Sequence, residues 1–139
     1  MEEKDIFCRI IDGEIQSNIV YEDQDVIAIL DISQTTRGHT LVMPKKHYGD
    51  FLACPAELMG KVMNVAQKLG QAMMRELGAD GVNILSNVGE AAGQSVPHFH
   101  VHVIPRYLDA QGGFRIEMQS QKVNMLELHD LADQIKESL

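Results

Sequence analysis

Residues 93–106 read Gly93-Gln94-Ser95-Val96-Pro97-His98-Phe99-His100-Val101-His102-Val103-Ile104-Pro105-Arg106. In a β-strand successive side chains point to opposite faces, so the three histidines share one face and the apolar residues between them share the other. The apolar face would anchor the strand in the core and hold the imidazoles rigidly, as a reactive group requires. We therefore predict a strand over residues 98–104. Pro105 should end it, because proline lacks the donor that a sheet ladder needs.

The row of histidines can be interpreted in three ways. A purely structural role explains three histidines in strict alternation poorly, since the whole chain has only six. Histidines at i and i+2 on a strand can bind zinc or iron, but no carboxylate stands between Glu90 and Asp109 to complete such a site. Imidazole is also a good nucleophile when one ring nitrogen is free and the other donates a hydrogen bond. The sequence favours this last interpretation and leaves a metal-dependent enzyme as an alternative.

The loop before the histidines suits a phosphate group. Gly93, Gln94 and Ser95 offer backbone N–H groups, an amide and a hydroxyl in a flexible segment. Such donors can hold phosphate oxygens and meet a leaving group. The loop and the histidine row together indicate chemistry at phosphorus.

Composition limits the partners of the chain. It has 139 residues, 45% of them hydrophobic and 23% charged, which is typical of one globular domain over residues 1–139. A formal net charge of -8 argues against binding a nucleic acid polymer. No apolar run is long enough for a membrane span, and the acidic N-terminus is unlike a secretory signal, so we expect a cytoplasmic protein without a membrane partner.

The remaining segments predict an α+β fold. Residues 18–22 and 26–30 have the composition of a hairpin, and residues 39–43 and 82–86 of further strands. The apolar run 6–11 could be either a strand or a helix. A helix over residues 55–77 is predicted from apolar residues at three-and-four spacing, namely Leu58, Val62, Val65, Leu69, Met73 and Leu77.

A second helix is predicted near the C-terminus. Asn124 can cap it, with Glu127 three residues on. Its expected buried face consists of Met125, Leu128, Leu131 or Ala132, and Ile135. Strands and helices do not alternate as repeating units, so we expect a mainly antiparallel sheet covered by helices.

The histidine segment resembles the histidine-triad (HIT) motif, His-φ-His-φ-His-φ-φ with φ apolar, preceded by the Gly-Gln-Ser-Val of that family. Further segments resemble the family in the right order, namely Ile6-Phe7-Cys8, Asp31-Ile32-Ser33, Gly38-His39-Thr40-Leu41-Val42-Met43-Pro44-Lys45-Lys46-His47 and Asn87. The chain is similar to small bacterial members of the branch that hydrolyses nucleoside phosphoramidates. This resemblance implies a five-stranded antiparallel sheet with one long helix and a C-terminal helix, extended by homodimerisation.

The resemblance also implies an activity and its catalytic residues. His100 would attack the α-phosphorus of a purine nucleotide derivative, and water would hydrolyse the nucleotidyl-histidine to release a nucleoside monophosphate such as AMP. His102 would hydrogen-bond the phosphate, and His98 would orient the row. Ser95 would attend the leaving group or phosphate, and His39 would be a further polar partner.

The nucleotide-binding residues implied by the resemblance come from four segments. Asp31 would take the ribose hydroxyls, and Asn87 would contact the phosphate side. Gly93, Gln94 and Ser95 would surround the phosphate. The base would lie against apolar side chains, which are Ile6, Phe7 and Ile32.

No cofactor is required by this chemistry, and the sequence predicts no metal-binding residues, although a structural zinc is possible. Some bacterial relatives bind a structural zinc through Cys-x-x-Cys and two histidines. Here Asp5 stands at the first cysteine position, which leaves Cys8, His47 and His98 as candidates, and a carboxylate binds zinc less tightly than a thiolate.

Two questions of function stay open at this stage. Pro105-Arg106 is also seen in relatives that split dinucleoside polyphosphates, so both kinds of leaving group remain. A purine nucleotide-binding or sensing module with incidental catalysis is the alternative to a hydrolase.

Overall fold

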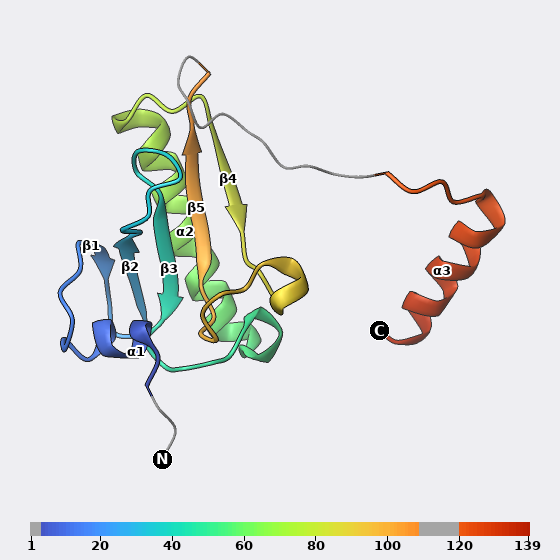
Figure 1. Ribbon diagram of the computed structural model, residues 1–139, viewed down its shortest axis with the longest axis horizontal. Coiled ribbons are helices and arrows are strands. Elements are labelled where there is room, and N and C mark those ends of the chain that lie inside the picture. The colour runs from blue at the N-terminus through green and yellow to red at the C-terminus, as the bar shows by residue number, and fades with distance from the viewer. Residues whose placement is uncertain (1–3, 109–119) are drawn as a thin grey trace.

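The computed structural model describes residues 4–108 and 120–139, which include a five-stranded antiparallel sheet in the order β1-β2-β3-β5-β4 (Figure 1). The strands are β1 (Ile19–Glu22), β2 (Val26–Leu30), β3 (Thr40–Pro44), β4 (Gly81–Leu85) and β5 (Val101–Arg106). The predicted hairpin is therefore confirmed as β1 and β2. Asp23 closes its turn, because its Oδ1 accepts the N–H groups of Asp25 and Val26. The strand β5 lies between β3 and β4, inside the sheet.

The long helix α2 (Ala56–Glu76) covers one face of the sheet. Its spacing confirms the sequence prediction, and its buried residues are Val62, Val65, Ala66, Gly70 and Met73. Phe99, Val101 and Val103 belong to the same core cluster as this face. The apolar alternates of the histidine segment thus point towards α2, as predicted.

The short helix α1 (Ile6–Ile11) decides the question that periodicity left open for that run. Asp5 caps the helix, because its side-chain Oδ1 accepts the backbone N–H of Cys8. From α1, Phe7 packs with Ile27, Leu41 and Met43 in a second cluster of buried residues. Alternation along the strands means that this cluster lies on the face opposite α2.

Strand β5 differs from its prediction at both ends. Strand β5 begins at Val101 instead of His98, and it continues through Pro105 to Arg106. The carbonyl of Pro105 accepts the hydroxyl of Thr36, so this side of Pro105 faces a loop beyond the end of β3. The missing N–H lies on the same side as that carbonyl, and its absence therefore breaks no ladder bond.

The C-terminal helix α3 (Met125–Glu137) begins as predicted, with the side chain of Asn124 accepting the N–H of Glu127. The prediction of a buried face was wrong for this chain, because α3 has no buried residue. Leu128 is 48% exposed and Ile135 is 62% exposed. Figure 1 shows α3 standing apart from the sheet, where no described segment covers it.

Two short 3-10 helices complete the described elements, η1 (Phe51–Ala53) before α2 and η2 (Glu90–Ala92) in the loop before the histidines. Among the described residues, none of the helices has the length and apolar character to cross a lipid bilayer.

Candidate active site

His100 stands immediately before β5, in the extended segment that enters the strand. Its Nδ1 lies 2.7 Å from the carbonyl oxygen of His98. A carbonyl oxygen can only accept, so Nδ1 carries the ring proton and Nε2 keeps a free lone pair. Burial is the main influence on this side chain, and it lowers the pKa of His100. The imidazole is therefore neutral at pH 7, which is the state that can act as a nucleophile.

His102 lies on β5 and takes its tautomer from a chain of two further residues. The N–H of Thr35 donates to Nδ1 of His39 over 3.2 Å, so the proton of the His39 ring is on Nε2. That Nε2 lies 2.9 Å from Nδ1 of His102 and donates to it. The proton of His102 is consequently on Nε2. Burial, together with the neighbouring His100 and His39, lowers the pKa of His102 to about 4.

The rings of His100 and His102 are neighbours with complementary roles. Their centroids are 4.9 Å apart and their planes are inclined by 62°. His100 offers a lone pair, and His102 offers an N–H donor. Apart from burial, the influences on the pKa of His100 are the carbonyl of His98 and the carboxylates of Asp31 and Asp5. The pair can attack phosphorus through Nε2 of His100 and donate to a phosphate oxygen through Nε2–H of His102.

The ring of His98 is turned away from this pair, into a second cluster. It is fully buried, and Phe7 packs against it edge-on, with ring centroids 5.7 Å apart. Its Nε2 lies 3.4 Å from the carbonyl oxygen of Pro44. The structure thus brings together His39, His100 and His102, whereas His98 contributes its backbone carbonyl to the nucleophile.

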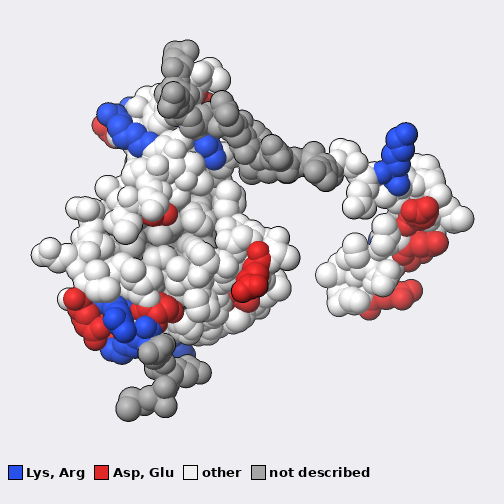
Figure 2. All heavy atoms as spheres, in the orientation of Figure 1, with Lys and Arg blue, Asp and Glu red and all other residues white. Residues whose placement is uncertain are grey.

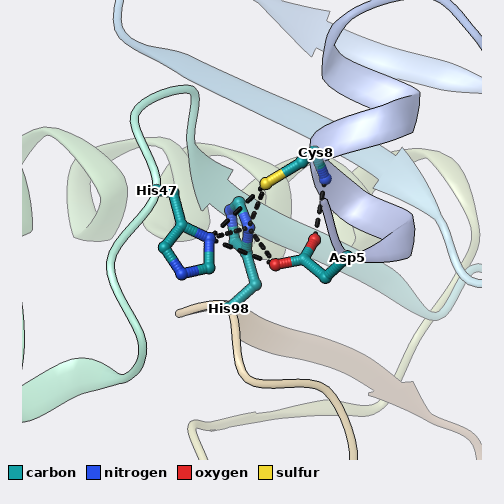
Figure 3. Close-up of side chains that lie close together, drawn as sticks. All are labelled: Asp5, Cys8, His47 and His98. Atoms are coloured by element: carbon teal, nitrogen blue, oxygen red, sulfur yellow. Dashed lines mark hydrogen bonds and ion pairs between the residues drawn. The ribbon is translucent and has the colours of Figure 1, made fainter. Parts of the chain in front are cut away.

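The second cluster consists of Asp5, Cys8, His47 and His98 (Figure 3). The Nδ1 atoms of the two histidines are 3.2 Å apart, and Sγ of Cys8 lies 3.5 and 3.6 Å from them. Oδ2 of Asp5 lies 3.1 Å from Nδ1 of His47 and 3.2 Å from Nδ1 of His98. Tetrahedral zinc separates two nitrogen ligands by about 3.4 Å and a nitrogen from a sulfur by about 3.6 Å. The four side chains therefore fit the ligand set of a zinc ion.

The pKa values of Asp5 and Cys8 in this cluster are shifted in opposite directions. Burial by itself raises the pKa of Asp5, but the N–H of Cys8 and the attraction of His98 outweigh burial and hold the pKa below its usual value. Burial and the charge of Asp5 raise the pKa of the Cys8 thiol. A metal cation would reverse this last effect, because a ligating thiol is deprotonated.

The phosphate loop is held in place by Gln94. Its Oε1 accepts the N–H of Gly89 over 2.9 Å, and its Nε2 donates to the carbonyls of Gly49 and Val96 over 2.8 and 3.0 Å. The Gln94 amide thus shapes the loop and ties it to the segment that carries His47. Ser95 is exposed on this loop.

Asn87 stands at the other end of the same loop. Its Nδ2 lies 3.5 Å from the carbonyl oxygen of Gly93. The backbone of Gly93 is in the left-handed region, with φ of 93°. A glycine suits this position, because other residues rarely adopt that conformation.

The residues expected at the ribose and base differ in how open they are. Asp31 follows β2, and its Oδ1 accepts the N–H of Ser33 while Oδ2 lies 3.6 Å from Nε2 of His39. Ile32 is 92% exposed and Ile6 is 46% exposed, so both present apolar surface. Phe7 is buried against the rings of His98 and His100 and presents little apolar surface to a ligand.

Sequence reasoning missed two residues that support the site. Thr35 fixes the tautomer of His39 through its backbone, which no side-chain pattern signals. Gln34 Nε2 donates to the carbonyls of Asp31 and His39, while its Oε1 accepts the N–H of Gly38. A glutamine in a loop flanked by candidate site residues was the available signal.

The fold is an antiparallel sheet covered by a long helix, and the site consists of neutral histidines at the interior strand β5. Together they define a protein with a histidine-based active site. The chain belongs to the HIT family, since the HIT domain matches residues 12–109. The protein named hit of Bacillus subtilis is 49% identical over 107 residues, which are 77% of this chain and 74% of the relative. A crystal structure of a HIT family protein from Bacillus anthracis is 43% identical, with a TM-score of 0.92, and the match covers 100% of this chain and 99% of the other.

Two further relatives have names that describe a ligand or an activity. A zinc-bound histidine triad family protein from Mycobacterium smegmatis is 35% identical, with a TM-score of 0.74 and a match that covers 96% of both chains. The adenylylsulfatase HINT3 of Arabidopsis thaliana is 37% identical over 101 residues, which are 73% of this chain and 51% of the relative.

Proposed function

We propose that this protein is a nucleotide-binding hydrolase that acts at the α-phosphate of purine nucleotide derivatives. The observation that carries the proposal is the hydrogen bond from Nδ1 of His100 to the carbonyl of His98, which leaves Nε2 free. In the first step, Nε2 forms a bond to phosphorus and the bond to the leaving group breaks. The leaving group takes the electron pair and a proton, for which the exposed hydroxyl of Ser95 is the proposed donor.

In the second step, water attacks the same phosphorus and the N–P bond breaks, and the proton that the water loses restores the hydroxyl of Ser95. The products are a nucleoside monophosphate and the free imidazole of His100. His102 donates its Nε2–H to a phosphate oxygen in both steps, and His39 holds that tautomer. The chemistry requires no cofactor.

The substrate class follows from the same site. Asp31 would accept the ribose hydroxyls, and the apolar surfaces of Ile6 and Ile32 would contact the base. A nucleoside phosphoramidate or a dinucleoside polyphosphate would supply the leaving group. The Arabidopsis relative is named an adenylylsulfatase. This name supports a substrate in which the bond to be broken joins an adenylyl group to the leaving group.

The test uses chelator-treated protein and a fluorogenic adenosine phosphoramidate. We expect the wild type to release AMP and His100→Ala to lose about 10³-fold or more of that rate, because the nucleophile is gone. His129→Ala is the matched control, since this histidine is exposed on α3 and should be silent. Undiminished turnover in His100→Ala would refute the nucleophile, and nucleotide binding without turnover in the wild type would favour a sensing module.

We further propose that Asp5, Cys8, His47 and His98 hold a structural zinc ion. The tetrahedral spacing of their ligand atoms and the zinc-bound relative support it. Zinc would cross-link α1 to the segments around His47 and His98, away from the reacting atoms.

Metal analysis of purified protein tests the zinc site. We expect about one zinc per chain in the wild type and in Cys54→Ser, and loss of it in Cys8→Ser. Cys54 is the matched control, because it is the other cysteine of the chain and its thiol donates to the carbonyl of Pro55, outside the cluster of Asp5, Cys8, His47 and His98. Equal zinc content in the two serine variants would refute the assignment.

We also propose that the chain forms a homodimer that extends the sheet. Strand β4 is at one edge of the sheet, and unpaired edge strands are ready templates for pairing. An apolar hollow lies beside it, lined by Phe51, Met63, Ile84, Leu85, Ser86, Val88 and Val101.

Three further expectations from the sequence remain predictions. They are the single domain over residues 1–139, the cytoplasmic location and the absence of a nucleic acid partner.

A further inference from the structure

Ser86 lies where the chain leaves β4, and it contacts the backbone of the proposed nucleophile. Strand β4 ends at Leu85, which is paired with His102 on β5. The half-buried hydroxyl of Ser86 then donates to the carbonyl oxygen of His100 over 2.7 Å. The reaction proposed above gives this hydroxyl no role.

The carbonyl of His100 points towards β4 because of its place in the strand register. At the far end of the same strand, the carbonyl of Arg106 accepts the N–H of Asp80, the residue before β4. Backbone groups of successive residues point to opposite sides of a strand, so residues an even number apart direct them to the same side. The carbonyl of His100 therefore needs a donor from the β4 side.

The chain leaves the ladder just before it would supply this donor from its backbone. Continued pairing of β4 with β5 would place Asn87 opposite His100. Strand β4 ends two residues earlier, and residues 87–96 form the phosphate loop. The hydroxyl of Ser86 donates in place of a ladder bond. It thus ties the backbone of the nucleophile to the point where the phosphate loop begins.

The imidazole of His100 depends on this backbone for its position. Its Nδ1 is held by the carbonyl of His98, and its ring packs edge-on against Phe7 with centroids 4.9 Å apart. These contacts fix the ring relative to its own segment, and the Ser86 bond fixes that segment relative to the phosphate loop. A misplacement of about 1 Å between reacting groups can lower a rate by about 100-fold.

We propose that Ser86 is a positioning residue, which fixes the His100 imidazole relative to the phosphate loop through its hydrogen bond to the His100 backbone. The inference rests on the hydrolase function proposed above. The contacts proposed for the ribose and the base lie elsewhere, at Asp31 and Ile32. The Ser86 hydroxyl should therefore affect kcat and leave KM nearly unchanged.

The experiment measures turnover of the fluorogenic adenosine phosphoramidate by the purified wild type, Ser86→Ala and Ser86→Thr. We expect Ser86→Ala to lower kcat at least tenfold and to change KM by less than about twofold. Ser86→Thr keeps the hydroxyl and should retain kcat within about threefold. A kcat of Ser86→Ala within twofold of the wild type would overturn the inference.

Tyr107→Phe is the matched control for a general loss of stability. It also removes a hydroxyl that donates to a backbone carbonyl, that of Arg37 over 2.6 Å, beyond the other end of β5. We expect this variant to keep the kcat of the wild type. An equal loss of kcat in Tyr107→Phe and Ser86→Ala, or a loss that Ser86→Thr shares, would leave Ser86 with a structural role only.

A second readout requires no turnover. The Nδ1–H of His100 is bonded to a carbonyl inside the protein, so its NMR signal should be visible and should be missing in His100→Ala. We expect this proton to exchange with water at least tenfold faster in Ser86→Ala than in the wild type or Ser86→Thr. That difference in a wild type without turnover would refute the hydrolase and retain the positioning role. Equal exchange in all three proteins would overturn the positioning role whatever the turnover.

Discussion

The two central histidines depend on different kinds of support. The tautomer of His100 is set by the backbone carbonyl of His98, which a side-chain substitution leaves in place. The tautomer of His102 is set by the side chain of His39, which depends in turn on the backbone of Thr35. Substitution of His39 should therefore affect the phosphate donor and leave the tautomer of the nucleophile intact.

The half-buried His102 should make the fold sensitive to acid. Its pKa is lowered to about 4 from an ordinary value of 6.5, so the unfolded chain binds this proton more readily than the folded one. The contribution of His102 to the free energy of unfolding is thus complete above about pH 6.5 and is lost as the pH falls towards 4. With solvent screening taken into account, the loss amounts to about 1–2 kcal/mol.

Urea unfolding at pH 7.5 and pH 4.5 measures this effect. The variant His102→Gln should lose less stability between the two pH values than the wild type does. An equal loss in both proteins would contradict the role of His102. Burial also lowers the pKa of His39, so part of the acid sensitivity should persist in the variant.

At the scale of elements, Gly38 is where the loop before β3 meets the end of α2 and the end of β5. It has φ of +105°, and a Cβ atom there would lie 2.6 Å from Cδ1 of Leu77 and 3.2 Å from Cγ of Pro105. We expect Gly38→Ala to lower the free energy of unfolding by about 2–4 kcal/mol, from backbone strain and overpacking together. Urea unfolding measures it.

Gly60→Ala is the control for that substitution. Gly60 lies inside α2, and a Cβ atom there would meet nothing within 4 Å. Alanine should therefore stabilise the helix by about 1 kcal/mol. If both variants lose stability equally, the crowding at Gly38 does not explain its effect.

The elements that the sequence predicted best are those with a long periodic pattern. Six apolar positions between Leu58 and Leu77 specify α2, and the cap at Asn124 specifies the start of α3. The run 6–11 was too short for periodicity to decide. The end of β5 was predicted wrongly, because the hydroxyl of Thr36 that accommodates Pro105 comes from a residue 69 positions away.

At the scale of the whole molecule, the motif predicted where the chemistry lies but not how the site is assembled. His39 and His102 are 63 residues apart, and Asp5 and His98 are 93 apart. Only the order of the strands and the position of α1 bring these side chains together. The uncovered face of α3 was unpredictable for a similar reason, since amphipathic spacing shows that a helix needs a partner surface but not whether its own chain supplies one.

A phosphate site built from neutral donors has a consequence for encounter with the substrate. The chain carries a formal net charge of -8, and Figure 2 shows Lys and Arg side chains at the margins of the drawn face of the body. The protein as a whole should therefore repel an anionic nucleotide over long range, and dissolved ions should screen that repulsion. We expect kcat/KM for a nucleotide substrate to rise with ionic strength between about 20 and 300 mM, whereas a site lined by cations would lose rate. Stopped-flow measurement of the association rate constant at both salt concentrations would distinguish the two kinds of site. Added ions should raise that rate constant here, because they screen the repulsion between the protein and the anionic substrate.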